Sequence, residues 1–97
     1  MSIEINKILQ YSVDAKASDL HLSTTSVPMV RIDGLVKPLQ LPVLSKDDMI
    51  NIKNEVLTHN QQTLLDEKLE IDFSYEIKGY GRFRVNFFHQ INGLSAS

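Results

Sequence analysis

The sequence predicts an α+β fold in which helices pack on a mainly antiparallel sheet. Two segments, around residues 5–13 and 49–56, carry apolar residues at helical spacing, and residues 70–91 alternate apolar and polar residues as strands do. Glycine-containing turns separate the alternating runs, which is typical of strands that pair as antiparallel hairpins. The 97 residues suffice for one modest core, so we expect a single domain over residues 1–97.

The composition excludes several classes of protein. A formal net charge of −2 argues against a nucleic-acid-binding module, which needs a concentrated basic face. The absence of cysteine excludes disulfides and thiolate metal sites. The sequence contains neither a signal peptide nor an apolar run long enough to insert in a membrane. We therefore expect a soluble domain.

An amphipathic helix is predicted near the N-terminus. Ser2 can act as its N-cap, and residues 15–18 should end it. Its apolar residues recur along one face at positions i, i+3, i+4 and i+8, namely Ile5, Ile8, Leu9 and Val13. This face should pack on the rest of the domain.

Residues 19–23 predict a strand because their side chains alternate. Leu20 and Leu22 share one face, whereas Asp19 and His21 share the other. Asp19 and His21 can form a polar pair, which we interpret as structural rather than as a ligand or a base. The three histidines lie on separate predicted elements with no helical i, i+4 pair, so no metal site is predicted.

A hairpin is predicted over residues 29–41. Asp33-Gly34 favours a two-residue type I′ turn between strands at 29–32 and 35–41. Pro38 cannot donate a ladder hydrogen bond, so the second of these strands is disfavoured as a central strand.

Two further helices are predicted before the last strands. Ser45 and Asp48 form a capping box with the shorter acid, and Leu44 and Met49 hold the positions of a hydrophobic staple. Asn60 can cap the second, shorter helix. The apolar residues of these helices are Met49, Ile52, Val56 and Leu57 in the first and Leu64, Leu65 and Leu69 in the second.

Residues 70–94 give the most regular pattern in the chain, two long strands joined by a glycine turn. One face is apolar and is formed by Ile71, Phe73, Tyr75, Ile77, Phe83, Val85, Phe87 and Ile91. The opposite face is acidic on the first strand. On the second strand it carries Arg82 and Arg84, two of the three arginines in the chain.

The pairing of these two strands can be inferred because directly opposed residues share a face. A four-residue loop would mix the faces, whereas the three-residue loop Gly79-Tyr80-Gly81 keeps them matched. This loop places Ile77 opposite Phe83 and Glu76 opposite Arg84.

A third strand should follow an Asn92-Gly93 turn. That turn places Ile91 opposite Leu94 and His89 opposite Ala96. The strand is cut short at the end of the sequence, so we expect the domain to be truncated at its C-terminus.

Arg82 and Arg84 are the remaining candidates for chemistry. The chain contains no phosphate-binding loop, dinucleotide fingerprint, zinc-protease motif or nucleophile elbow, so no catalytic residue is predicted. One interpretation of the two arginines is a solvated strand face with a Glu76–Arg84 pair. The other is an anion-binding pair, since guanidinium groups at i, i+2 can converge on phosphate oxygens.

Four short motifs in order carry a resemblance to a known family. They are Ala17-Ser18-Asp19-Leu20-His21-Leu22, then Arg31-Ile32-Asp33-Gly34, then Asp72-Phe73-Ser74, and finally Gly81-Arg82-Phe83-Arg84-Val85-Asn86 with Gln90 and Gly93. In this order and spacing, the chain resembles the N-terminal domain of the type II/IV secretion ATPases. Within that superfamily it is most similar to the pilus retraction, or twitching-motility, ATPases.

The resemblance implies a PAS-like domain that precedes a RecA-like motor, which is absent from this chain. It implies a cytoplasmic homohexamer that docks on an inner-membrane platform protein. The domain would pack on the motor domain of the adjacent subunit, and Arg82 and Arg84 would sense the γ-phosphate side of its nucleotide in trans. The longer protein would bind ATP and Mg²⁺, whereas this chain has no Walker lysine and should bind no cofactor itself. Asn92 stands where a basic residue is common in the family.

Two alternatives remain open from the sequence. One is a free-standing PAS-like sensor or interaction module that binds a small ligand within its fold. The other is the equivalent domain of a pilus-assembly or type II secretion ATPase. A P-loop encoded beyond Ser97 would distinguish a motor protein from a sensor.

Overall fold

The computed structural model describes residues 4–90 and 93–96. These residues form three helices and six strands, which confirms the predicted α+β class. In chain order the elements are α1 (Ile5–Asp14), β1 (Asp19–Ser23), β2 (Met29–Ile32), β3 (Leu35–Pro38), α2 (Lys46–Val56), α3 (His59–Lys68), β4 (Glu70–Ile77), β5 (Gly81–Gln90) and β6 (Gly93–Ala96).

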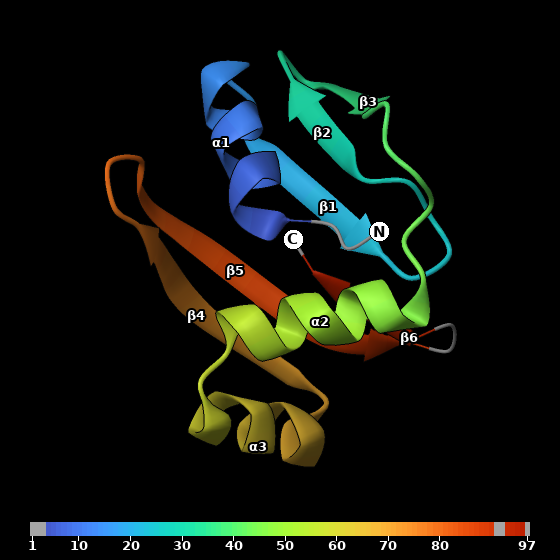
Figure 1. The fold of residues 1–97 in the computed structure, drawn as a ribbon, viewed down its shortest axis with the longest axis vertical. Coiled ribbons are helices and arrows are strands. Elements are labelled where there is room, and N and C mark those ends of the chain that lie inside the picture. The colour runs from blue at the N-terminus through green and yellow to red at the C-terminus, as the bar shows by residue number, and fades with distance from the viewer. Residues whose placement is uncertain (1–3, 91–92, 97) are drawn as a thin grey trace.

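The strands form one antiparallel sheet in the order β3-β2-β1-β6-β5-β4. β6 therefore joins two halves of the sheet, one from the start of the chain and one from its end. Figure 1 shows α1 in front of β1 and α2 in front of β5 and β6, with α3 at the end of β4. The helices thus cover one face of the sheet and leave the other open.

The core lies between the helices and the apolar sheet face. Phe87 is at its centre, only 1% exposed, and its ring stacks on Phe73 at a centroid distance of 6.3 Å. Leu44 and Met49, the predicted staple residues, are completely buried. The buried cluster comprises Ile5, Leu9, Leu22, Leu44, Met49, Ile52, Val56, Leu57, Leu65, Ile77, Phe87, Leu94 and Ala96.

The helix caps are partly as predicted. The Ser45 capping box is confirmed: the Ser45 backbone N–H donates to Asp48 at 2.8 Å, and the Asp48 backbone N–H donates to Ser45 Oγ at 3.0 Å. The prediction of Asn60 as the cap of α3 is wrong. Thr58 is the N-cap and forms a reciprocal box with Gln61, which satisfies two backbone donors at once and leaves Asn60 inside the first turn.

Other boundaries also shift. α1 begins at Ile5 with Glu4 as its N-cap, and the proposed cap Ser2 lies outside the described residues. Leu69 does not continue the face of α3, because it adopts a left-handed conformation at the C-cap and is 58% exposed. β3 ends at Pro38 rather than at Leu41, and it lies at a sheet edge, where proline is tolerated.

The β4–β5 register differs from the prediction by two residues. The loop has three residues, as predicted, but it is Lys78-Gly79-Tyr80, so Ile77 pairs with Gly81 and not with Phe83. Glu76 consequently lies opposite Arg82 rather than opposite Arg84. A shift of two keeps every side chain on its predicted face, so the apolar pattern could not distinguish the two registers.

The β5–β6 register shifts in the same way. His89 lies opposite Leu94 rather than opposite Ala96, which pairs with Phe87. Gly93 begins β6 and pairs with Gln90. The predicted turn residue Asn92 and the predicted pairing of Ile91 lie outside the described residues.

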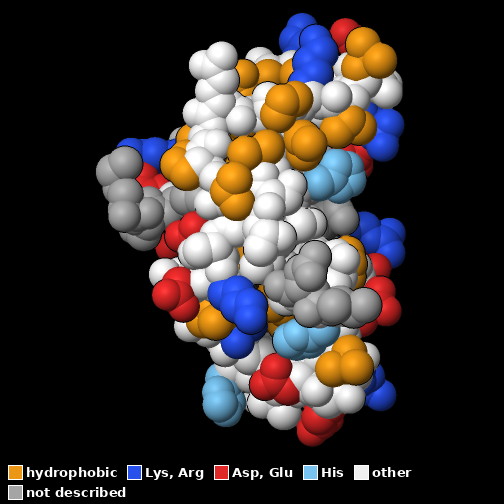
Figure 2. Space-filling view, turned by 90° about the vertical axis from the view of Figure 1, so that its right-hand side faces the viewer, with side chains coloured by type: hydrophobic (Ala, Val, Ile, Leu, Met, Phe, Trp, Pro, Cys, Tyr) orange, Lys and Arg blue, Asp and Glu red, His pale blue; other side chains and the backbone are white. Residues whose placement is uncertain are grey.

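The β3 edge of the sheet exposes apolar side chains. Figure 2 shows hydrophobic side chains gathered on the upper part of this side of the molecule. The largest exposed ones on β3 and the segment after it are Leu35, Val36, Leu41 and Val43. Pro38 closes the strand and removes one backbone donor from this edge, which limits its pairing with another chain.

Candidate functional site

The open face of the β4–β5 hairpin carries the two candidate arginines. Along β4 this face presents Glu70, Asp72, Ser74 and Glu76, and along β5 it presents Arg82, Arg84 and Asn86. Strand alternation places these side chains here because the other face is occupied by the core. The hairpin thus opposes an acidic strand to a basic one on a solvent-exposed surface.

Side chains on this face bond diagonally rather than straight across. Arg84 lies opposite Ser74, yet it donates from Nη2 and Nε to the Asp72 carboxylate at 2.9 and 3.3 Å. Asn86 lies opposite Asp72 but donates to Glu70 at 3.0 Å. Diagonal neighbours are within reach of long side chains. The predicted Glu76–Arg84 pair is therefore replaced by Asp72–Arg84.

The same diagonal leaves Arg82 without an acid. By this pattern Arg82 would reach Ser74, and no ion pair or side-chain hydrogen bond of Arg82 occurs among residues 4–90 and 93–96. Arg82 and Arg84 line a shallow depression of about 580 Å³ together with Asp72, Phe73 and Ser74. The depression offers one uncommitted guanidinium beside a second one held by a carboxylate.

Asp19 is bound to Arg31 rather than to His21. The Asp19 carboxylate lies 3.3 Å from Nε of Arg31 and accepts a hydrogen bond from Ser18 Oγ at 3.1 Å. Arg31 lies directly across the β1–β2 ladder from Asp19, whereas His21 is two residues along the same strand and opposite Met29. No hydrogen bond or ion pair within the described part of the chain joins Asp19 to His21.

The Asp72–Arg84 ion pair should make the titration of Asp72 depend on Arg84. The hydrogen bond from Arg84 lowers the pKa of Asp72, and the same contact raises the pKa of Arg84. A carboxyl whose folded-state pKa is lowered stabilises the fold above its ordinary pKa, and this contribution is lost as the pH falls below about 4. In an NMR titration of the side-chain carboxyl carbons, Arg84→Ala should move the Asp72 midpoint upward.

Arg82→Ala is the matched control for that titration. Arg82 is on the same strand face but forms no hydrogen bond or ion pair with Asp72, so its removal should leave the Asp72 midpoint in place. Equal upward shifts in the two variants would show that general surface charge, and not the hydrogen bond, sets the pKa of Asp72.

Metal-ligand clusters and membrane-length helices are both missing from the part of the chain that the structure describes. Across residues 4–90 and 93–96, His, Asp and Glu side chains nowhere gather in a group of three or more that could hold a metal ion. Within the same residues, no helix has the length and apolar character needed to cross a membrane. His89 lies 3.8 Å from Asp66 of α3, a contact between two elements rather than a cluster.

The chain has relatives among known proteins. No protein-family model matches it. It is 39% identical over 94 residues to the type IV pilus retraction ATPase PilT of Pseudomonas aeruginosa, a match that covers 97% of this chain and 27% of that protein. This chain is homologous to PilT. It is also 35% identical over 69 residues to a twitching motility protein of Neisseria gonorrhoeae, covering 71% of this chain and 18% of that protein.

The homology to PilT extends to the fold. A crystal structure of the pilus retraction motor PilT with bound ADP superposes with a TM-score of 0.89 at 34% identity, covering 98% of this chain and 28% of the motor. The chain corresponds to the N-terminal region of PilT. It therefore spans about a quarter of the length of PilT.

The strand pattern predicts the positions of both arginines but not the partner of Arg84. In the sequence, Asp72 is only part of a motif and one of several acidic residues on the outward face. Its contact with Arg84 depends on a register and a diagonal that alternation does not encode. Asp72 lies on the same outward face as Arg84, and this position was the one clue to their contact. Glu70 and Glu76 lie on that face too, so the clue does not identify Asp72 as the partner.

Proposed function

We propose that this chain acts as the non-catalytic N-terminal domain of a hexameric pilus retraction ATPase. In this role it packs on the motor domain of the adjacent subunit and couples the state of the nucleotide to movement of the ring during twitching motility. The observation that carries the proposal is the match to PilT over nearly the whole chain, in sequence and in fold. The twitching motility protein among its relatives supports the same process.

The arginine surface supports a role in sensing the nucleotide. Arg82 is exposed and free of acidic partners in the described part of the chain, so binding a phosphate oxygen would not first require breaking an ion pair. The Arg84 side chain is 84% exposed, but its guanidinium is hydrogen-bonded to the Asp72 carboxylate. This ion pair holds the Arg84 side chain along the strand. We assign Arg82 direct contact with the γ-phosphate side of the neighbouring nucleotide and Arg84 a supporting contact.

The remaining parts of the proposal concern the longer protein. ATP and Mg²⁺ would be bound by the RecA-like motor and not by this domain. The assembled ring would lie in the cytoplasm against an inner-membrane platform protein. The domain holds no ATP-hydrolysing site of its own, because its sequence lacks a phosphate-binding loop.

A chimaeric motor tests the proposal. This chain would replace the matching segment of Pseudomonas aeruginosa PilT, and ATP hydrolysis would be measured with and without Arg82→Ala. Loss of a guanidinium that stabilises developing phosphate charge should lower kcat about tenfold or more. Circular dichroism of the 97-residue variant should be unchanged, because the Arg82 side chain is exposed.

Lys78→Ala provides the matched control in the chimaera. Lys78 is an exposed cation in the adjoining loop of the same hairpin, so it tests whether positive charge alone matters. Equal decreases in kcat in the Lys78→Ala and Arg82→Ala variants would refute phosphate contact by Arg82. Substantial ATP turnover by the purified 97-residue chain would refute the non-catalytic role.

A further inference from the structure

The guanidinium of Arg84 is held by a single carboxylate through two hydrogen bonds. Its Nη2 donates to Oδ2 of Asp72 at 2.9 Å, and its Nε donates to Oδ1 at 3.3 Å. Two parallel hydrogen bonds of this kind are also how a guanidinium binds two oxygens of a phosphate. Asp72 therefore occupies an edge of Arg84 that could otherwise bind a phosphate.

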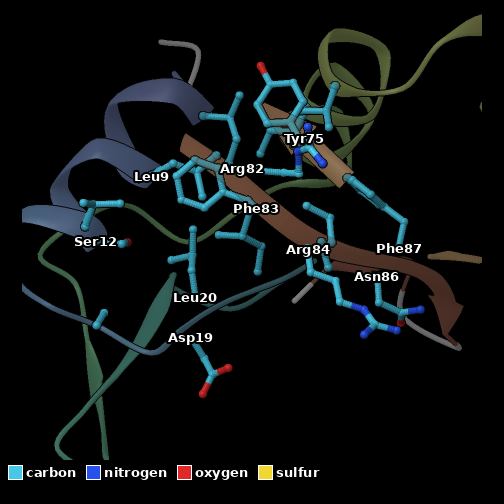
Figure 3. Close-up of a pocket in the computed structure, with 18 of the residues that line it drawn as sticks. Leu9, Ser12, Asp19, Leu20, Tyr75, Arg82, Phe83, Arg84, Asn86 and Phe87 are labelled. Atoms are coloured by element: carbon cyan, nitrogen blue, oxygen red, sulfur yellow. The ribbon is translucent and has the colours of Figure 1, made fainter. Parts of the chain in front are cut away.

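The contact with Asp72 turns Arg84 away from Arg82. Asp72 stands opposite Asn86, which lies two residues after Arg84 along β5. Arg82 lies two residues before Arg84, so at 3.3 Å per residue the Arg82 position is about 13 Å from the position opposite Asp72. In Figure 3 the Arg84 side chain accordingly extends toward Asn86 and away from Arg82. The two guanidinium groups thus diverge along the strand.

A phosphate that binds both arginines has to lie between them. The residue of β4 at that place is Ser74, which is exposed and stands directly opposite Arg84. Ser74 lines the shallow depression of the hairpin face together with both arginines, and its hydroxyl can donate to a phosphate oxygen. Arg84 can direct Nε and Nη2 at an anion there only after these groups have left Asp72.

The ion pair between Arg84 and Asp72 is weak enough to be exchanged. The Arg84 side chain is 84% exposed and that of Asp72 is 48% exposed, so water screens the attraction between their charges. The hydrogen bond from Arg84 lowers the pKa of Asp72, so the carboxylate stays charged at neutral pH and competes with an incoming anion. An exposed pair of this kind changes an equilibrium by no more than about fivefold.

We propose that Asp72 is an intramolecular competitor that keeps Arg84 off the phosphate site until a ligand with a terminal phosphate binds Arg82. When that phosphate is in place, Arg84 exchanges Asp72 for it and turns toward Arg82, and both guanidinium groups converge on one anion. The second arginine contact is then conditional on the first. The role of this exchange in the motor rests on the proposed function, and it identifies which contact of the arginine surface changes with the nucleotide.

The exchange favours a nucleoside triphosphate over a diphosphate. Arg82 is assigned to the γ-phosphate side, so a nucleotide without that phosphate does not bring an anion between the arginines. Arg84 then stays on Asp72. Removing the carboxylate of Asp72 should therefore strengthen the binding of a triphosphate and leave the binding of a diphosphate unchanged.

Binding of inorganic tripolyphosphate to the 97-residue chain tests the exchange without a motor domain. An NMR titration follows the Arg84 Nε–H group and the Asp72 carboxyl carbon, which should shift with the same dissociation constant as the guanidinium changes partner. Asp72→Asn should lower this dissociation constant about two- to fivefold, because a neutral amide competes less strongly than a carboxylate. Unchanged or weaker binding would overturn the inference, since Asp72 would then position Arg84 for the ligand.

Glu76→Gln is the matched control for surface charge. Glu76 lies on the same face, directly opposite Arg82, and its substitution removes one negative charge without disturbing the contact between Asp72 and Arg84. Each substitution is combined with Arg84→Ala in a double-mutant cycle. The gain from Asp72→Asn should disappear when Arg84 is absent, whereas any gain from Glu76→Gln should persist. A gain from Asp72→Asn that survives Arg84→Ala would refute competition for Arg84.

The chimaeric motor separates this inference from the proposed function. There Asp72→Asn should tighten the binding of a non-hydrolysable ATP analogue about two- to fivefold and leave ADP binding unchanged. Equal effects on the two nucleotides would overturn the selectivity. If Arg82→Ala leaves kcat unchanged while the tripolyphosphate results hold, the proposed function fails and the exchange stands. If Arg82→Ala lowers kcat while Asp72→Asn changes no binding constant, the exchange alone fails.

Discussion

Replacing Phe87 with alanine should remove a large share of the stability of this domain. Phe87 is 1% exposed and stacks on Phe73, and truncation of a buried phenylalanine costs about 3–5 kcal/mol through lost burial and the cavity left behind. Domains of this kind are stable by only about 5–15 kcal/mol. Urea unfolding followed by circular dichroism should therefore show a large drop in the transition midpoint.

Phe88→Ala is the matched control for this prediction. Phe88 is the next residue on β5, has the same side chain, and lies half-buried on the opposite face. Its truncation removes the same atoms without opening a cavity in the central core. The decrease in unfolding free energy should therefore be clearly smaller than for Phe87→Ala. Equal losses in the two variants would place the main core on both faces of the sheet, contrary to the helix-covered face observed.

Gly93→Ala should be the second severe substitution. Gly93 has φ of +130°, and a Cβ at this position would lie 2.8 Å from Thr24 Oγ1. The Thr24 hydroxyl is buried and donates to the Leu94 carbonyl at 2.9 Å, so it cannot move aside freely. The backbone strain alone should cost about 1–3 kcal/mol, and the steric contact adds to it. Thermal unfolding should show a Tm lower by several degrees.

Gly79→Ala is the control that separates backbone strain from the steric contact with Thr24 in the Gly93 variant. Gly79 also has a positive φ, +90°, but nothing lies within 4 Å of the added Cβ, so only the backbone cost applies. Gly93→Ala should therefore lower Tm more than Gly79→Ala. In a Thr24→Ala background the difference should shrink, because Oγ1 and Cγ2 of Thr24 are removed and only its Cβ, at 3.1 Å, remains close. An undiminished difference there would show that the Thr24 hydroxyl and methyl are not its cause.

Local sequence signals were sufficient for much of the fold. The Ser45–Asp48 box formed as expected because both partners lie within one turn of helix. Asp33-Gly34 gave the two-residue turn that pairs Ile32 with Leu35. Such features depend on residues three or four apart and need no information about the rest of the chain. The cap of α3 was mispredicted because two local signals competed, and the reciprocal Thr58–Gln61 box prevailed over Asn60.

The candidate site was predictable only in part. Alternation placed Arg82 and Arg84 together on the open face, and homology to PilT supports the family to which the motifs had pointed. Alternation could not reveal that Asp72 engages Arg84 while Arg82 has no ion pair with any residue that the structure describes. That difference follows from a diagonal contact between strands, which exists only once the hairpin has its register and twist.

Periodicity in the sequence predicted most of the side chains that face the core, because a strand has a period of two and a helix a period near 3.6. Val13 and Leu64 are exceptions: both belong to the predicted apolar helix faces, yet they are 39% and 42% exposed. The tertiary structure decided which residues of β4, β5 and β6 stand opposite one another. A shift of two residues preserves both faces, so the turn backbone at Lys78-Gly79-Tyr80 and the packing of the sheet selected the register. The insertion of β6 between β1 and β5 likewise depends on contacts between segments some seventy residues apart along the chain.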